Sequence, residues 1–378
     1  MVAFARQLIF GRFDALLLGA ALLLVGFGLL TMNSFTAESY FFDRQIIWVA
    51  VALAVLAVAS LVDWRWLRES RFIMLLYAAG ALALLLLLGL GHTARGAQSW
   101  FVLQGIAWQP ADLMKLVVIV VLAKYFSRRH VEIAHVRHIL VSGFYALVPF
   151  LLILLQPDFG SGVVVGLIWL GMIIFSGVSK KHLLAVLGLG VAAFVVAWFF
   201  VFAPYQKERI ITFIHPLADI RGAGYNAFQS TVAIGSGRIW GKGVGYGTQS
   251  RLQFLPEYET DFIFAAFAEE WGLIGVLVLF LLFAVVIWRV VALAMVGETN
   301  FEALFGIGLV IFLISHFIIN VGMNLGLLPV TGLTLPFMSY GGSHLVTEFL
   351  GLGMLLGMNR YARGYHRDDL KNEFLGVG

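Results

Sequence analysis

Residues 72–91 read FIMLLYAAGALALLLLLGLG, twenty residues without a single charged side chain. An α-helix rises about 1.5 Å per residue, so this stretch is long enough to cross a hydrocarbon core about 30 Å thick. Hydrophobic residues make up 61% of the 378-residue chain and charged residues only 12%. That charged share is roughly half of what a soluble domain carries. The composition therefore excludes a water-soluble fold.

Similar apolar runs recur along almost the whole chain. Within lipid the backbone groups of each run must be satisfied internally, as they are in a helix. We therefore predict an all-α polytopic membrane protein, a bundle of about ten transmembrane helices in a single membrane domain. Their expected ranges are 14–33, 44–62, 72–91, 111–126, 139–155, 161–178, 182–203, 262–288, 302–323 and 344–359. The first run lacks a clear signal-peptide cleavage site, so we expect it to be retained.

Lys and Arg residues are distributed unevenly between the two sides of this predicted bundle. Sixteen lie in the termini and connections of one side, whereas the short loops opposite hold only Arg44 and Arg95. Short loops rich in positive charge stay in the cytoplasm. We therefore predict cytoplasmic termini and a long, partly ordered extracytoplasmic loop at residues 204–260. This bias accounts for the net charge of +4, so we expect no nucleic-acid partner. Without cysteine, the chain has no disulfide and no thiolate metal site.

Polar residues gather at the outer ends of the fourth to sixth apolar runs, which are short for a span of about 20 residues. Pro110, Asp112 and Lys115 stand at the start of the fourth run, and residues 156–160 (QPDFG) separate the fifth from the sixth. The pattern indicates a recessed polar cavity. Asp112 and Lys115 are three residues apart, which fits an ion pair within one helix and equally a cation presented to an anionic lipid headgroup. Asp158 is a candidate ligand or a turn residue.

Glycines and cations are interleaved in the long outer loop, for example at residues 222–224, 235–237 and 241–243. Glycine lets successive backbone N–H groups face an anion, and Arg or Lys adds charge, so the composition suits a phosphate or pyrophosphate. The spacing excludes a Walker-type nucleotide loop. Tight turns remain an alternative reason for the glycines. The candidate ligands of this loop are Arg209, Gln229, Ser230, Lys242, Thr248 and Gln249.

Residues 254–264 (FLPEYETDFIF) lead from the polar loop into an apolar run. Asp261 lies where the polar loop enters the membrane. Its carboxylate could act as a general base, and an Asp at a helix start is also typical of an N-cap. Glu257 and Thr260 are further candidate ligands beside it. Glu269 and Glu270 lie two turns deeper, facing a cavity or pairing with a buried cation.

These pieces, in this order, resemble the SEDS family of peptidoglycan polymerases over nearly the whole chain. The most specific matches are residues 110–115, 156–160, 219–230, 233–248, 254–264 and 326–343. The form Pro329-Val330-Thr331-Gly332 is closer to the elongation member RodA than to the division member FtsW. The resemblance implies a glycosyltransferase that joins lipid II into glycan strands on the outer face of the bacterial cytoplasmic membrane. It makes Asp261 the general base for the acceptor hydroxyl, with inversion at the donor sugar and undecaprenyl pyrophosphate as the leaving group.

This chain departs from the family pattern in three places. Asp112 stands where the family usually has Glu, Glu259 replaces a basic residue or His, and His344 replaces a second serine.

The resemblance also implies partners, namely a class B penicillin-binding protein and the elongation machinery. We expect Lys115 and Arg209 to bind pyrophosphate, and we expect no tightly bound cofactor, with a divalent cation (Mg or Mn) left open. A lipid II flippase and a non-catalytic scaffold for the transpeptidase are the alternative functions.

Overall fold

The computed structural model describes most of the chain, namely residues 14–34, 40–68, 71–94, 97–103, 106–128, 136–200, 202–214, 224–252, 254–297 and 299–375. Some residues used in the sequence analysis lie outside these ranges. They are Arg6, Arg12, Arg95 and Arg129 of the charge count, and residues 219–223 of the outer loop.

Helices dominate the described chain, and each predicted apolar range falls on one helix. These helices are α2 (Ala15–Asn33), α3 (Tyr40–Leu61), α4 (Phe72–Leu90), α5 (Pro110–Ser127), α6 (Val136–Leu155), α7 (Phe159–Phe175), α8 (Lys180–Phe200), α12 (Ile263–Met295), α13 (Asn300–Asn324) and α14 (Gly342–Leu375). Seven of them, α2, α3, α4, α6, α8, α12 and α13, are long and apolar enough to cross a membrane. The prediction of an all-α polytopic membrane protein is confirmed. Membrane crossing by α5, α7 and α14 stays a prediction.

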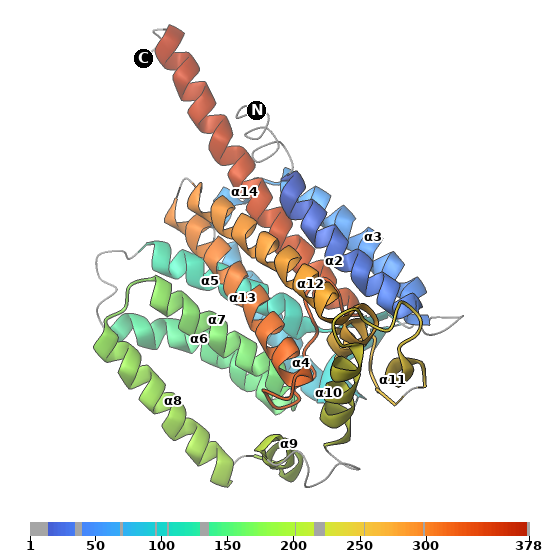
Figure 1. Cartoon of the computed structure of the whole chain (residues 1–378). Coiled ribbons are helices and arrows are strands. Elements are labelled where there is room, and N and C mark those ends of the chain that lie inside the picture. The colour runs from blue at the N-terminus through green and yellow to red at the C-terminus, as the bar shows by residue number, and fades with distance from the viewer. Residues whose placement is uncertain are drawn as a thin grey trace.

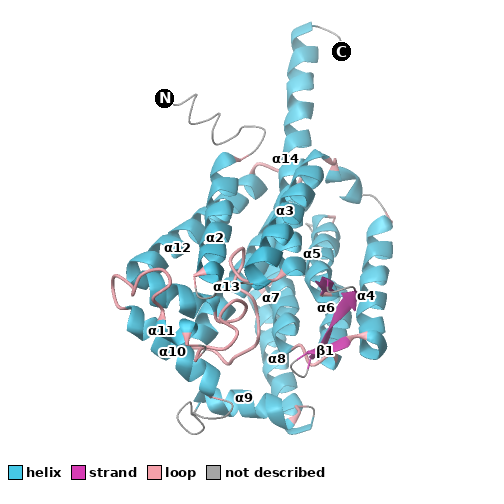
Figure 2. Cartoon of the chain, turned by 90° about the vertical axis from the view of Figure 1, so that its right-hand side faces the viewer, coloured by secondary structure: helices cyan, strands magenta, loops and turns pink. Residues whose placement is uncertain are grey.

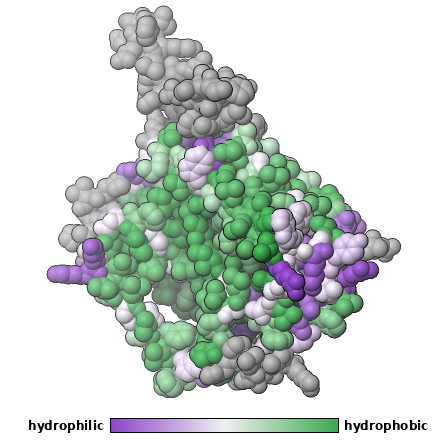
Figure 3. Space-filling model, viewed as in Figure 1, coloured by the Kyte–Doolittle hydropathy of each residue, from purple (hydrophilic) through white to green (hydrophobic). Residues whose placement is uncertain are grey.

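The described part of the outer loop contains three helices, α9 (Pro204–Ile214), α10 (Tyr225–Gly237) and the single turn α11 (Thr248–Arg251). They lie at one end of the bundle, whereas the start of α2 and the C-terminal end of α14 lie at the other (Figures 1 and 2). In the space-filling view the flank of the bundle is mostly apolar, and hydrophilic side chains gather near α10 and α11 (Figure 3).

Helix α13 is central to the packing, because it contacts α5, α7, α12 and α14. Around it, α2 lies along α12 and α3 lies along α14 (Figure 1). Glycines allow the second of these pairs to approach closely. A Cβ added to Gly353 or Gly357 of α14 would lie 2.8 Å from a backbone oxygen of α3 or of the turn after it, at Leu56 or Val62. In contrast, α8 buries none of its residues and lies apart from the other helices in the view (Figure 1).

A small antiparallel sheet between α4 and α5 was not predicted. It has the order β1-β2-β3, with β1 at His92–Ala94, β2 at Ala97–Leu103 and β3 at Ile106–Trp108 (Figure 2). Strand register pairs His92 with Trp100 and Phe101 with Trp108. From the hydropathy pattern, residues 92–109 were expected to form only a short loop between two helices. The sheet places Ser99 and Trp100 at the edge of the cavity described below.

Helix α12 is broken at Gly272, whose φ of 64° and ψ of −165° are not helical. Residues 238–243 of the outer loop dock into this break. Four backbone hydrogen bonds join the two segments: Leu273 N to Arg238 O (2.9 Å), Ile274 N to Ile239 O (3.2 Å), Lys242 N to Glu269 O (3.0 Å) and Gly243 N to Glu270 O (3.0 Å). A Cβ on Gly272 would lie 2.2 Å from Gly241 N, so only glycine allows this approach.

Candidate active site

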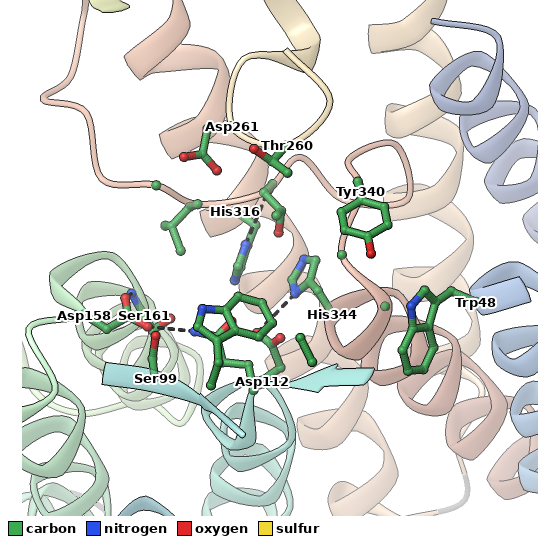
Figure 4. Close-up of a pocket in the computed structure, with 18 of the residues that line it drawn as sticks. Trp48, Ser99, Asp112, Asp158, Ser161, Thr260, Asp261, His316, Tyr340 and His344 are labelled. Atoms are coloured by element: carbon green, nitrogen blue, oxygen red, sulfur yellow. Dashed lines mark hydrogen bonds and ion pairs between the residues drawn. The ribbon is translucent and has the colours of Figure 1, made fainter. Parts of the chain in front are cut away.

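A cavity of about 720 Å³ lies among α3, α5, α7, α13, α14, the small sheet and residues 331–342. Six of the residues predicted from the sequence line it: Asp112, Lys115, Asp158, Arg209, Thr260 and Asp261. Figure 4 shows Thr260 and Asp261 on one side of the cavity and Asp112 on the other, with His316 and His344 between them. The recessed polar cavity expected from the short apolar runs is therefore present, and it collects candidates that are up to about 150 positions apart in the chain.

The main chain of Asp261 is held by two buried asparagines of α13. Asn320 Nδ2 donates to Asp261 O at 2.9 Å, and Asn324 Nδ2 donates to the same oxygen at 3.0 Å. Asn320 also donates to Leu333 O at 2.7 Å, which ties the segment after α13 to Asp261. A Cβ on Gly332 would lie 3.6 Å from Asp261 Oδ2, so the carboxylate lies beside this segment. The clamp uses the peptide oxygen and does not use the carboxylate.

Residues next to Asp261 are fixed in the same way by the segment before α14. Ser339 Oγ donates to Thr260 O at 2.7 Å, and Tyr340 N donates to Glu259 O at 2.8 Å. Burial raises the pKa of the Tyr340 phenol, so this cavity-lining hydroxyl stays protonated at neutral pH. Three consecutive residues that lead into α12 are thus positioned by hydrogen bonds to their carbonyl groups.

The N-cap interpretation of Asp261 is wrong in detail. Helix α12 begins at Ile263 and its N-cap residue is Phe262, which makes no side-chain cap. One amide of the first turn, Ala265 N, donates instead to Asn324 Oδ1 at 3.2 Å. A side chain from a neighbouring helix therefore supplies a contact that sequence reasoning assigned to the local Asp.

The floor of the cavity contains a buried ion pair. Lys115 Nζ lies 3.1 Å from Asp112 Oδ1, and only 1% and 4% of the two side chains are exposed. Ser343 Oγ donates to the second oxygen of Asp112 at 2.9 Å. Lys115 Nζ also lies 3.3 Å from His316 Nε2. The ion pair expected from the i, i+3 spacing therefore forms, and because both residues line the cavity it also presents charge to any ligand there.

Asp158 and Arg209 both lie at the outer rim of the cavity. Asp158 Oδ1 accepts from Ser161 N at 3.0 Å, which makes it the N-cap of α7, while Gln109 Nε2 donates to its other oxygen at 2.8 Å. Arg209 of α9 reaches Val330 O with Nη1 at 3.5 Å. Asp158 thus has the structural role that its position in a turn suggested, and it still faces the cavity.

The remaining predicted ligands lie outside the cavity lining. Lys242, Thr248 and Gln249 gather around the buried carboxylate of Glu269. Its Oε1 is 2.7 Å from Lys242 Nζ, 3.2 Å from Thr248 Oγ1 and 3.1 Å from Gln249 N. The expectation that Glu269 pairs with a cation agrees with this geometry. In this structure, the Lys242 and Thr248 side chains and the Gln249 amide hold the loop to α12.

Three further candidates are also placed away from the cavity surface. Ser230 Oγ donates to Asn324 O at 2.8 Å, so it supports the clamp on Asp261 from behind. Glu257 accepts from Thr260 Oγ1 at 3.1 Å. Gln229 is half-buried on α10 and does not line the cavity. Their role as substrate ligands stays a prediction.

Sequence reasoning missed most of the supporting residues on α13. His316, Asn320 and Asn324 follow each other at intervals of four residues, so they share one face of an otherwise apolar helix. All three are buried. Polar side chains at helical spacing inside an apolar run were the available signal, because such residues in membrane helices face the protein interior.

Comparisons with known proteins agree with this architecture. A family model described as the cell cycle protein family FtsW/RodA/SpoVE matches residues 6–364. The chain belongs to the SEDS family. It is 34% identical to stage V sporulation protein E of Bacillus subtilis over 93% of this chain and 98% of that protein. It is 35% identical to the peptidoglycan glycosyltransferase MrdB of Escherichia coli over 85% of this chain and 86% of that one.

A solved relative resembles the SEDS chain in three dimensions. It comes from a study of the structural coordination of polymerization and crosslinking by a peptidoglycan synthase complex. The TM-score is 0.79 at 30% identity, over 92% of this chain and 97% of that one. Relatives named as peptidoglycan glycosyltransferases support glycosyltransferase activity for this protein.

Proposed function

We propose that this SEDS protein polymerises lipid II into glycan strands on the outer face of the bacterial cytoplasmic membrane. The observation that carries the proposal is the placement of Asp261, whose carboxylate lines the cavity while its main chain is clamped by Asn320 and Asn324. A general base must be held at a fixed distance from the proton that it removes. The two hydrogen bonds to the peptide oxygen fix the position of the residue that carries the proposed base.

In the proposed reaction, Asp261 acts on the acceptor sugar, and the cations of the cavity act on the leaving group. Asp261 removes the proton from the 4-hydroxyl of the acceptor GlcNAc as that oxygen attacks the anomeric carbon of the donor MurNAc. The bond to undecaprenyl pyrophosphate breaks, and the configuration inverts from α to β. Lys115 and Arg209, which line the same cavity, stabilise the negative charge of the departing pyrophosphate. Described residues hold no group of three or more His, Asp or Glu side chains suited to a metal ion. A Mg or Mn ion accompanying the pyrophosphate is the alternative source of positive charge.

Support for an elongation-type enzyme comes from the residues that border Asp261. The segment Pro329-Val330-Thr331-Gly332 has the RodA-like form, and its last two residues line the cavity. Similarity to a chain from a complex that couples polymerization to crosslinking supports a class B penicillin-binding protein as partner. We therefore assign the protein to cell elongation, with that transpeptidase and the elongation machinery as its partners.

Incubation of the purified protein with labelled lipid II, alone and with its transpeptidase partner, tests the proposal. Products are resolved by length on a gel. Glycan strands longer than the substrate are expected, and a divalent-cation chelator added in parallel tests the metal alternative. Transport of lipid II across vesicles without strand synthesis would instead make the protein a flippase.

A further inference from the structure

Two buried groups of α14, His344 and Glu348, adjoin the Asp112–Lys115 pair, and His344 itself lines the cavity. His344 Nδ1 is 3.4 Å from Asp112 Oδ1, and His344 Nε2 is 2.9 Å from Glu348 Oε1. Figure 4 marks the first of these contacts. The contacts have ion-pair distances without the alignment of a hydrogen bond. At most 6% of any of these side chains is exposed, so one imidazole stands between two buried carboxylates.

The charges in this cluster balance when His344 is protonated. Asp112 and Glu348 then supply two negative charges, and Lys115 and His344 supply two positive charges. A buried charge without a partner is costly, so a balanced set of four is the favourable state. His316 fits as a neutral neighbour, because its Nδ1 lies 3.3 Å from the acceptor Thr334 O, which leaves Nε2 free to accept from Lys115.

We propose that His344 and Glu348 form a positioning pair that sets the location of the Lys115 ammonium in the cavity. The inference deepens the proposed function and rests on it, because it assigns these residues to the binding of the substrate pyrophosphate. His344 contacts Asp112 Oδ1, the same oxygen that Lys115 contacts, so the imidazole and the ammonium share one carboxylate oxygen. Removing His344 lets Asp112 move toward the vacated space, and the ammonium moves with it.

Glu348 extends the effect of the pair to the segment beside Asp261. Its Oε2 accepts from Phe337 N at 3.0 Å. Phe337 has a φ of 63°, a conformation that a residue other than glycine keeps only when its surroundings hold it. Two residues further on, Ser339 holds Thr260 O. The pair therefore supports both the cation and the turn that fixes the residue before the proposed base.

Strand synthesis by four forms of the full-length protein tests this inference: unmodified, His344→Gln, Glu348→Gln and the double variant. Each single change leaves one buried charge of the cluster uncompensated. We expect each to lower kcat/KM for lipid II by about 10²-fold, the size of effect that a displacement of about 1 Å produces at an active site. The double variant replaces the charged pair by two neutral amides, so the charges of Asp112 and Lys115 balance each other. Its kcat/KM is expected to be about tenfold higher than that of the less active single variant, because the effects of neighbouring substitutions are not additive.

His138→Gln is the matched control. His138 is also buried on a helix, with its Nδ1 2.9 Å from the Tyr125 hydroxyl, but it does not line the cavity. It is expected to leave kcat/KM within about twofold, whatever it does to the melting temperature. An unchanged His344→Gln protein, or a double variant whose loss is the product of the two single losses, would overturn the positioning pair while leaving the polymerase intact. An unmodified protein that makes no strands would overturn the proposed function, and the inference with it.

Discussion

At the residue scale, the main chain of Asp261 is held by hydrogen bonds, and its side chain is the proposed general base. Its peptide oxygen takes both asparagine hydrogen bonds, and the amide of Ala265 in the first turn of α12 is satisfied by Asn324. A substitution that changes only the carboxylate therefore leaves these contacts in place. This separation allows loss of catalysis to be distinguished from loss of folding.

Asp261→Asn is predicted to abolish strand synthesis without unfolding the protein. Loss of a positioned general base typically lowers the rate by about 10²–10⁴-fold. The clamp on the peptide oxygen is unchanged, so the melting temperature should stay within a few degrees of the original. The measurements are product length from labelled lipid II and thermal unfolding in the same detergent. Near-normal synthesis by this variant would leave the glycosyltransferase mechanism without its base.

Lys115→Met is predicted to impair stability as well as activity. The change leaves the Asp112 carboxylate buried without its nearest cation, and breaking a buried ion pair from one side costs about 3–5 kcal/mol. Adding Asp112→Asn removes the stranded charge, so the double variant should regain most of the melting temperature. It should still fail to make strands, because the ammonium is missing. A double variant that is both stable and active would restrict Lys115 to a structural role.

Predictions from the sequence were correct for contacts between residues that are close in the chain. They were weaker for side chains whose partners are many positions away. The Asp112–Lys115 pair follows from helical spacing, and it forms. Lys242 lies in a glycine-rich loop that suits phosphate, but Glu269, 27 positions away, binds its ammonium. No local pattern shows that this carboxylate reaches the loop. The same holds for Asn324, which reaches Asp261 from 63 positions away.

At the element scale, the break in α12 couples the outer loop to the bundle. Hydropathy alone predicts one uninterrupted run at residues 262–288, because glycine is apolar and common in membrane helices. The break needs the positive φ of Gly272 and the docking of residues 238–243, which are both tertiary features. Glu269 and Glu270 accept backbone N–H groups of this loop at the same place, through Gln249 N and Gly245 N respectively.

Gly272→Ala is predicted to release the loop from α12. The added Cβ would collide with Gly241 N, and the positive φ disfavours alanine, so a loss of at least about 1–3 kcal/mol in stability is expected. Limited proteolysis should cut residues 238–252 faster than in the unmodified protein. Gly166→Ala on α7 is the matched control, because its Cβ meets nothing within 4 Å. Equal protection of the loop in both variants would contradict the coupling.

At the scale of the whole molecule, apolar run length was enough to predict the helical bundle, but it could not reveal the small sheet. The runs exceed twenty residues in several places, and lipid leaves the backbone few other choices. Strands β1 to β3 are short and lie outside the apolar runs, where only pairing between neighbouring segments defines them. The cavity likewise depends on packing, because Asp112, Asp158 and Asp261 come from three separate parts of the chain.

Positively charged residues of different connections meet at one end of the molecule, as the predicted helix arrangement requires. Arg128, after α5, donates to Arg68 O at 2.8 Å, although the two belong to different connections. Near them, the Arg65 guanidinium lies 5.7 Å from the ring centre of Tyr361 on α14. Arg65 also lowers the pKa of Asp63 by hydrogen bonding to its carboxylate, so this carboxylate stays ionised at neutral pH.

Cysteine labelling of whole cells is predicted to modify the loop end of the protein and to spare this positive end. The chain has no cysteine, so Tyr246→Cys and Arg128→Cys each give a single thiol. Tyr246 is 69% exposed on the outer loop, and it avoids the strained positive φ of the neighbouring glycines Gly243 and Gly245. An impermeant thiol reagent, applied after the outer membrane is permeabilised, should label position 246 only. Because short positively charged loops stay in the cytoplasm, position 128 should react only after the inner membrane is opened as well. Labelling of position 128 with protection of 246 in intact cells would reverse the topology and place the cavity on the cytoplasmic side, where the proposed strand synthesis could not take place.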